Sequence, residues 1–335
     1  MKQRIDAERG PVLAAGGVLL AAAVGMLTVR LEHSWGKGVH LTVELAAFAV
    51  IFGIAWLSPL AERPLAYQSA LAVTGLVMLV IVLFRLADVF GVDNSGNSGT
   101  LVWISAIFTT VAAAAAMRFE SVASALFAGV GAAVFVVAVI DKVFDPSGVT
   151  TFRWIFFLLM LVFAAAAARL AQGPRPGFAV AAVDVAGLLL VALAATFAIT
   201  RFASVINPLS AGAGLSEGTP GFGWKFVLVV GPLAVIAYGA MRRERGPGLI
   251  GVSALVFAIV LIATPRGEAS IVGWPLLLLL AAGATLALGL RPRGGNGGGG
   301  AVAPTPGPHG GGAAAPASPP PPPAWDTREQ PPPTG

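Results

Sequence analysis

The chain has 335 residues, of which 56% are hydrophobic and only 11% are charged, whereas about 25% of the residues in an average soluble domain are charged. Its apolar runs repeatedly reach the roughly 18 to 20 residues needed to cross a hydrocarbon core about 30 Å thick. Together these properties exclude a soluble multidomain protein and predict a polytopic membrane protein.

Charge and cysteine content exclude further classes. The formal net charge of +5 does not indicate nucleic-acid binding, because the basic residues stand singly beside apolar runs, where membrane orientation explains them. The chain has no cysteine, which excludes a disulfide framework, a thiolate metal site and a cysteine nucleophile.

The apolar runs predict ten transmembrane helices. In lipid, a continuous apolar run of this length can satisfy its backbone polar groups only as a helix, whereas barrel strands would be about ten residues long with alternating polarity. Short polar connections between the runs predict successive hairpins, so the expected fold class is an all-α, polytopic transmembrane helix bundle. The expected spans are 11–30, 41–58, 67–90, 100–117, 120–140, 151–171, 178–200, 224–241, 248–263 and 270–290.

Composition divides the chain into a charged N-terminus (1–10), a transmembrane domain (11–290) and a tail (291–335) rich in glycine and proline. The tail includes the runs Gly297–Gly300 and Pro319–Pro323 and has too few large apolar residues to offset the entropy of ordering. We therefore expect a disordered tail with polyproline II character near its end. The proline-rich part either docks a cytoplasmic protein partner or is a solvated low-complexity segment.

Basic residues and tryptophans predict the orientation. More lysines and arginines flank the expected spans on the N-terminal side of the membrane than on the opposite side, which predicts that both termini are cytoplasmic. Trp35, Trp103, Trp154, Trp224 and Trp274 fall on the opposite side, as a headgroup-level belt requires. Arginine-dominated cations with abundant alanine, glycine and proline are typical of a GC-rich bacterial genome. We therefore expect a multi-pass protein of the bacterial inner (plasma) membrane.

A polar turn between two apolar runs, Arg85–Trp103, recurs at Val139–Trp154 and more loosely at Thr200–Trp224. Internal duplication explains the recurrence, but so does the shared need of such helices for tryptophan at one interface and arginine at the other. The polar residues of these turns are those that favour chain reversal.

Asp184 is the most interior ionisable residue of the expected spans. It lies 184 minus 178, or six, residues beyond Phe178, which is roughly 9 Å along a helix. Charged groups within spans are costly and are default functional hypotheses. Asp184 is either a proton- or cation-coupling carboxylate facing a hydrated cavity, or a structural carboxyl bonded to a neighbouring helix.

The other candidates lie at the expected outer interface. Arg85 and Asp88 are three residues apart, so they share a helix face and can pair. With Glu44 and Asp184 they form our candidate polar cavity, the alternative being interfacial side chains that reach water. His40 and Glu44 also share a face, and His33 could complete a zinc site, but the spacing matches no metal signature, and a hydrated loop with a half-buried Glu44 is the favoured interpretation.

The motif search gives no enzyme class. The sequence contains no phosphate-binding loop, no nucleophile elbow and no zinc-protease helix. We therefore predict no catalytic residues, no cofactor and no metal. An intramembrane enzyme is the third-ranked function, because the sequence has no convincing acid, base or metal cluster, and two functions rank above it. One is a secondary transporter or carrier of a lipid or small solute, which suits many spans with scattered intramembrane charge. The other is a non-catalytic membrane scaffold or assembly protein that uses its proline-rich tail.

Overall fold

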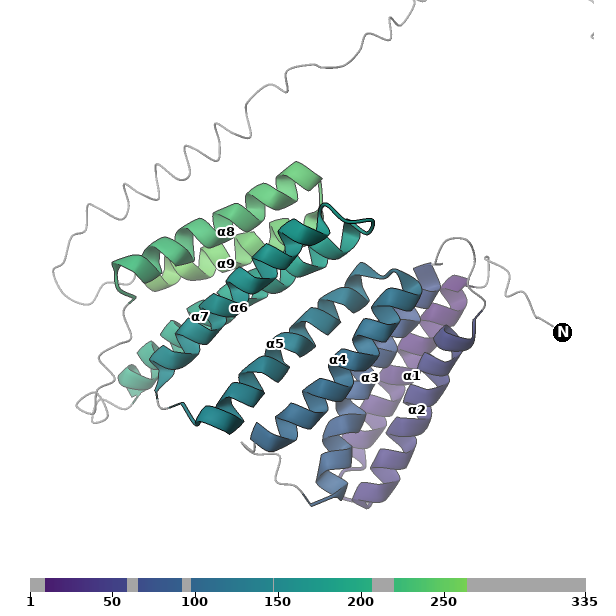
Figure 1. Cartoon of the computed structure of the whole chain (residues 1–335). Coiled ribbons are helices and arrows are strands. Elements are labelled where there is room, and N and C mark those ends of the chain that lie inside the picture. The colour runs from purple at the N-terminus through teal and green to yellow at the C-terminus, as the bar shows by residue number, and fades with distance from the viewer. Residues whose placement is uncertain (1–9, 59–65, 92–97, 147, 207–219, 264–335) are drawn as a thin grey trace, which may run out of the picture. The chain divides into compact units, whose positions relative to one another are not determined.

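The computed structural model describes residues 10–58, 66–91, 98–146, 148–206 and 220–263 (Figure 1). Within these ranges every regular element is a helix, and no strand occurs. The helices are α1 (Gly10–Arg30), α2 (Lys37–Leu57), α3 (Ala66–Val89), α4 (Ser98–Phe119), α5 (Val122–Phe144), α6 (Val149–Leu170), α7 (Gly177–Ile206), α8 (Phe222–Arg242) and α9 (Arg245–Ala263).

These nine described helices confirm the expected fold class. Each is long and apolar enough to cross a membrane. Their bounds agree with the first nine predicted spans to within four residues, except that α7 continues to Ile206. The tenth predicted span (270–290) and the tail (291–335) lie outside the described residues.

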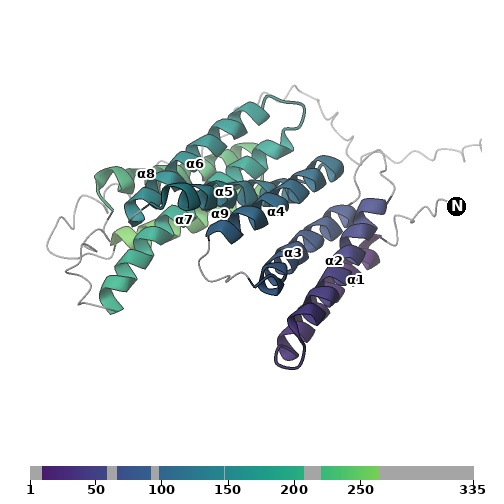
Figure 2. The same ribbon diagram turned by 60° about the horizontal axis from the view of Figure 1, so that its bottom comes forward.

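The helices form successive hairpins (Figure 1). The closest pairs are α2 with α3, α4 with α5, α6 with α7, and α8 with α9, and α1 packs on α2 and α3 (Figure 2). We call the end at which these four pairs are joined the turn end, and the opposite end the loop end. Successive hairpins meet through α3, α5 and α7. α3 contacts both α4 and α5, α5 contacts α7, and α7 contacts both α8 and α9.

Two helices carry most of the core. In α3, apolar residues are buried along nearly the whole length of the helix. In α7, every residue from Ala181 to Leu190 is buried except Leu188. Both helices contact neighbours on several sides, which explains why their sequences are apolar all round rather than on one stripe.

Glycine sets the distance between packed helices. A Cβ at Gly239 of α8 would lie 2.7 Å from the backbone nitrogen of Gly248 in α9, so these two backbones are in direct contact. Similar close approaches join other pairs, through Gly17 (α1 to α3), Gly75 (α3 to α2), Gly129 (α5 to α7), Gly131 (α5 to α4), Gly187 (α7 to α9) and Gly231 (α8 to α7). Small residues are thus packing determinants here, as expected for helices that associate by van der Waals contact in lipid.

The described tryptophans follow the predicted belt. Trp35 precedes α2, and Trp103, Trp154 and Trp224 lie within the first two turns of α4, α6 and α8, which places all four at the loop end. The rings of Trp154 and Trp224 pack at a centroid distance of 5.0 Å. Trp56 lies at the turn end, where Arg118 donates to its carbonyl oxygen (2.7 Å) and stacks over its ring. Trp274 lies outside the described residues.

We expect the substitution Gly131→Ala to destabilise the protein. The new Cβ would lie 2.6 Å from Thr109 Oγ1 and 2.8 Å from Phe108 Cδ1, and such overpacking costs about 1–3 kcal/mol. Gly16→Ala is the matched control, because nothing lies within 4 Å of its Cβ position and alanine stabilises a helix interior by roughly 0.5–1 kcal/mol. Thermal unfolding in detergent measures both. Equal unfolding temperatures for the two variants would contradict the packing role of Gly131.

Candidate functional site

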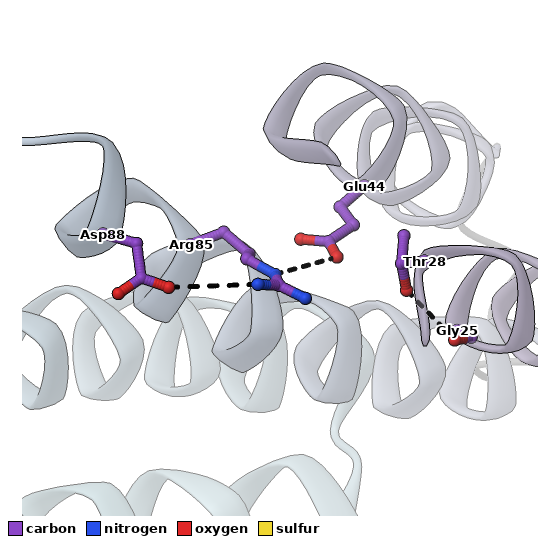
Figure 3. Close-up of polar contacts among 5 residues, drawn as sticks. All are labelled: Gly25, Thr28, Glu44, Arg85 and Asp88. Carbon is purple, nitrogen blue, oxygen red and sulfur yellow. Dashed lines mark hydrogen bonds and ion pairs between the residues drawn. The ribbon is translucent and has the colours of Figure 1, made fainter. Parts of the chain in front are cut away.

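Two features are candidates for a functional site: a partly buried ionic cluster among α1, α2 and α3, and an apolar seam between the α4–α5 and α6–α7 hairpins. In the cluster, Glu44 Oε1 of α2 lies 3.4 Å from Arg85 Nε of α3 (Figure 3). Arg85 Nη1 lies 3.9 Å from Asp88 Oδ2 one turn along α3, the pairing that their spacing predicts. Arg85 therefore holds two carboxylates that come from two helices.

Glu44 is far more buried than its sequence position suggested. Its side chain is only 1% exposed, so the expectation of a half-buried residue beside a hydrated loop is wrong. The physical reason is that α2 begins at Lys37 rather than near residue 40. Glu44 is thus about two turns inside the helix and points at α3 and α1 instead of the loop.

His40 lies one turn before Glu44 on the same helix and is also buried, at 3% exposed. Neither of its ring nitrogens has a hydrogen-bond partner, and Glu44 Oε2 has none either. The Trp35 ring covers His40 at a centroid distance of 5.5 Å. On the α1 side, Thr28 is buried and donates to Gly25 O of its own helix (Figure 3).

The zinc alternative gains no support. His33 is exposed, and among the described residues no three histidine, cysteine or acidic side chains are grouped closely enough to hold a metal ion. His40 was absent from the candidate cavity predicted above, although its i, i+4 spacing to Glu44 was readable.

Asp184 lies apart from this cluster. It is 6% exposed and faces the first turn of α9, where a Cβ on Gly246 would lie 2.9 Å from Asp184 Oδ2. Free N–H groups and the helix dipole favour a carboxylate at such a position. Asp184 is seven residues from the turn-end start of α7 (184 minus 177), whereas Glu44 is seven residues from the loop-end start of α2 (44 minus 37). The structure thus groups Glu44, Arg85 and Asp88 and places Asp184 at the other end.

Arg153 is another buried charged residue, and the sequence analysis did not predict its burial. Arg153 of α6 is 3% exposed and donates to Thr196 Oγ1 (3.4 Å) and Thr200 Oγ1 (3.2 Å) of α7. Its guanidinium also lies 3.8 Å from the centroid of the Phe197 ring. Because Arg153 stands next to Trp154 in the chain, its position suggested a basic residue at the membrane interface. The only available signal was the pair of threonines four residues apart in α7.

The apolar seam consists of two cavities along α7. The larger, of about 470 Å³, is lined by α5, α6 and α7 with Leu101 of α4, and Asp141 is the one charged residue in its lining. The smaller, of about 260 Å³, is lined by α4, α5, α6 and α7 closer to the turn end. Val185 lines both cavities, and a Cβ on Gly129 of α5 would lie 2.6 Å from its Cγ2. The α5–α7 contact thus borders both parts of the seam.

Both ends of the seam are polar. At the loop end its lining includes Asp141. At the turn end, Phe178 lines both the smaller cavity and a surface pocket of about 450 Å³ that contains Glu120 and Arg175. Arg175 Nε and Glu120 Oε1 form an ion pair at 3.3 Å. From Phe178 to Ala192 the seam follows 192 minus 178, or 14, residues of α7, roughly 21 Å of helix.

The nine apolar helices in the described part of the chain indicate an integral membrane protein. Comparisons of the chain with protein-family models, with curated proteins and with solved structures found no match.

The ion pair between Glu44 and Arg85 predicts how substitutions at these residues change the unfolding free energy of the protein. Arg85→Gln leaves Glu44 buried without its counter-charge, and breaking a buried pair in this way costs about 3–5 kcal/mol. Adding Glu44→Gln restores most of the loss, because both charges are then gone. Asp88→Asn, at a side chain that is 33% exposed, should cost less than about 1 kcal/mol. A double-mutant cycle of unfolding free energies measures the coupling, and additive effects of the Arg85 and Glu44 changes would contradict it.

Proposed function

We propose that this protein is a membrane carrier that binds a lipid or another apolar small molecule in the seam between the α4–α5 and α6–α7 hairpins. The observation that carries the proposal is the apolar cavity of about 470 Å³. Ligand pockets in proteins typically measure about 300–1,000 Å³ and combine an apolar lining with a few polar groups.

The distribution of polarity favours an amphipathic ligand. The middle of the seam is lined by residues such as Val137, Phe156 and Leu189, which suit an acyl chain. The Arg175–Glu120 pair and Asp141 lie towards its two ends, where they suit polar headgroups.

A polar solute fits the described residues less well. Neither cavity of the seam is lined by Glu44, Arg85, Asp88 or Asp184. Glu44 is packed among three helices rather than set on a cavity wall that water reaches. These placements support a carrier of apolar or amphipathic molecules over a channel or carrier for ions and sugars.

The scaffold alternative depends on residues 291–335, which lie outside the described residues. No observation in the described ranges favours it over the carrier. For the carrier we place the turn end in the cytoplasm of a bacterial cell and the protein in the inner membrane. Support comes from the arginines near that end, such as Arg118, Arg169 and Arg242, and from the positive-inside rule.

Filling the larger cavity should reduce lipid handling. Ala192 lines the cavity, and Ala192→Phe places a ring where an acyl chain would lie. We expect a several-fold lower yield of crosslinks to a phospholipid with a photoreactive acyl chain in proteoliposomes, and slower movement of a fluorescent phospholipid between leaflets. Ala164→Phe is the matched control, because Ala164 of α6 is exposed and outside the seam. Equal crosslinking and transfer in both variants would refute the proposal.

The orientation is tested by cysteine labelling, since the chain has no native cysteine. Ser34→Cys lies at the loop end and Gln172→Cys at the turn end, both at exposed positions. In intact cells a membrane-impermeant maleimide should label Ser34→Cys alone, and Gln172→Cys should react only after permeabilisation. The reverse pattern would invert the proposed topology while leaving the seam untouched.

A further inference from the structure

The pair His40 and Glu44 is the most unusual group of polar side chains in the described part of the chain. Both are more than nine-tenths buried, yet both ring nitrogens of His40 and one carboxylate oxygen of Glu44 are without a hydrogen-bond partner. A buried polar atom left unpaired costs about 1–3 kcal/mol. The two residues that carry these three atoms lie one helical turn apart on the same face of α2. Leaving all three atoms unpaired is costly unless the site binds a ligand.

Charge shows which sign of ligand the site takes. Glu44 and Asp88 contribute two negative charges around the single positive charge of Arg85. These three side chains sum to minus one, and the exposed Lys37 lies beside Asp88, so the Glu44 side of the cluster is where an additional positive charge is needed. Because Arg85 occupies Glu44 Oε1, Oε2 is the atom left to receive that charge.

The groups around the pair come from three helices and one connection. On α1, the buried Thr28 closes the site, and Arg30 at the end of the helix is exposed. On α2, Lys37 is exposed and its Nζ lies 3.4 Å from Asp88 O. On α3 the charged groups are Arg85 and Asp88. In the α1–α2 connection, Glu32 and His33 are exposed, and only Trp35 covers His40.

We propose that His40 and Glu44 form a proton-binding site that exchanges with the aqueous phase at the loop end. The ligand is a proton rather than a metal ion, because no third ligand is grouped with them in the described residues and because a proton needs no cavity. The proposal goes beyond the carrier function and does not depend on it.

The chemistry requires one proton and no other reactant. A proton from water binds the free nitrogen of the neutral His40 ring, which becomes an imidazolium with two N–H donors. One donor can then reach Glu44 Oε2 while Oε1 stays with Arg85, and the neighbouring Trp35 ring, at a centroid distance of 5.5 Å, can stabilise the positive charge. No covalent bond to carbon forms or breaks, and release reverses the step.

The test uses the full-length protein in nanodiscs with ¹⁵N-labelled histidine. The chain has three histidines, so the imidazole region of the NMR spectrum contains three spin systems, and His40→Gln assigns one of them. We expect the His40 signals to change from the neutral to the protonated pattern in one step as the pH is lowered, because imidazole is the side chain suited to reversible protonation. His33, which is exposed, provides the internal control. A His40 ring that keeps one protonation state throughout would overturn the proposal.

Two variants test the role of Glu44. Glu44→Gln should weaken the proton affinity of His40 about tenfold or more, because a nearby carboxylate stabilises the imidazolium by more than about 1.4 kcal/mol at low dielectric. Asp88→Asn, which keeps Glu44, should change that affinity less than about threefold. If Glu44→Gln does not fold, the double variant Glu44→Gln/Arg85→Gln is compared with Arg85→Gln, so that both proteins lack the Arg85 charge and differ only in the charge at residue 44. Equal affinities in the Glu44 and Asp88 variants would overturn the pairing.

Discussion

Close approach of neighbouring helices at glycine positions is the interaction on which the rest of this structure depends. In lipid the helices gain nothing from excluding water, so they must associate through short van der Waals contacts. The Gly239–Gly248 contact and the close approaches of Gly75, Gly129 and Gly131 supply these contacts within hairpins and between them. A side chain at any of these positions would push two helices apart, which is why the packing is sensitive to single methyl groups.

The same apolar surroundings restrict where charge can lie. The three buried ionisable groups with clear neighbours, Glu44, Arg153 and Asp184, all lie within about two turns of a helix end and face another helix. Glu44 joins α2 to α3, Arg153 joins α6 to α7, and Asp184 faces α9. Charge near a helix end can reach donors, acceptors or water that the middle of the span does not offer. Arg153 uses hydroxyls and a ring face, whereas His40 and Glu44 leave atoms unpaired.

The fold was largely readable from sequence, whereas the sites were not. Spans follow from the length of apolar runs, and hairpins follow from short connections, because both are local properties of the chain. The pairing of Arg85 with Asp88 is also local. The contact of Arg85 with Glu44 depends on how α2 rotates against α3, and the start of α2 four residues earlier than expected changed the burial of Glu44. The seam is harder still to predict, since it is defined by what α5, α6 and α7 leave unfilled, and alanine composition does not reveal that.

The cluster and the seam belong to different hairpins, and α3 is the element through which they are connected. α3 carries Arg85 and packs on α2, and its Leu79 and Leu83 belong to the same buried cluster as Phe108 of α4. Phe108 packs edge-to-face on Phe127 of α5 at 6.2 Å, and two residues further along α5 Gly129 contacts Val185 in the seam. If His40 and Glu44 bind a proton as proposed, the change of charge acts on the contact between α2 and α3, and α3 reaches the proposed ligand seam only through α4 and α5. Packed cores respond to such changes by discrete shifts rather than by continuous deformation, so any coupling between the two proposed sites would have to pass through these helix contacts.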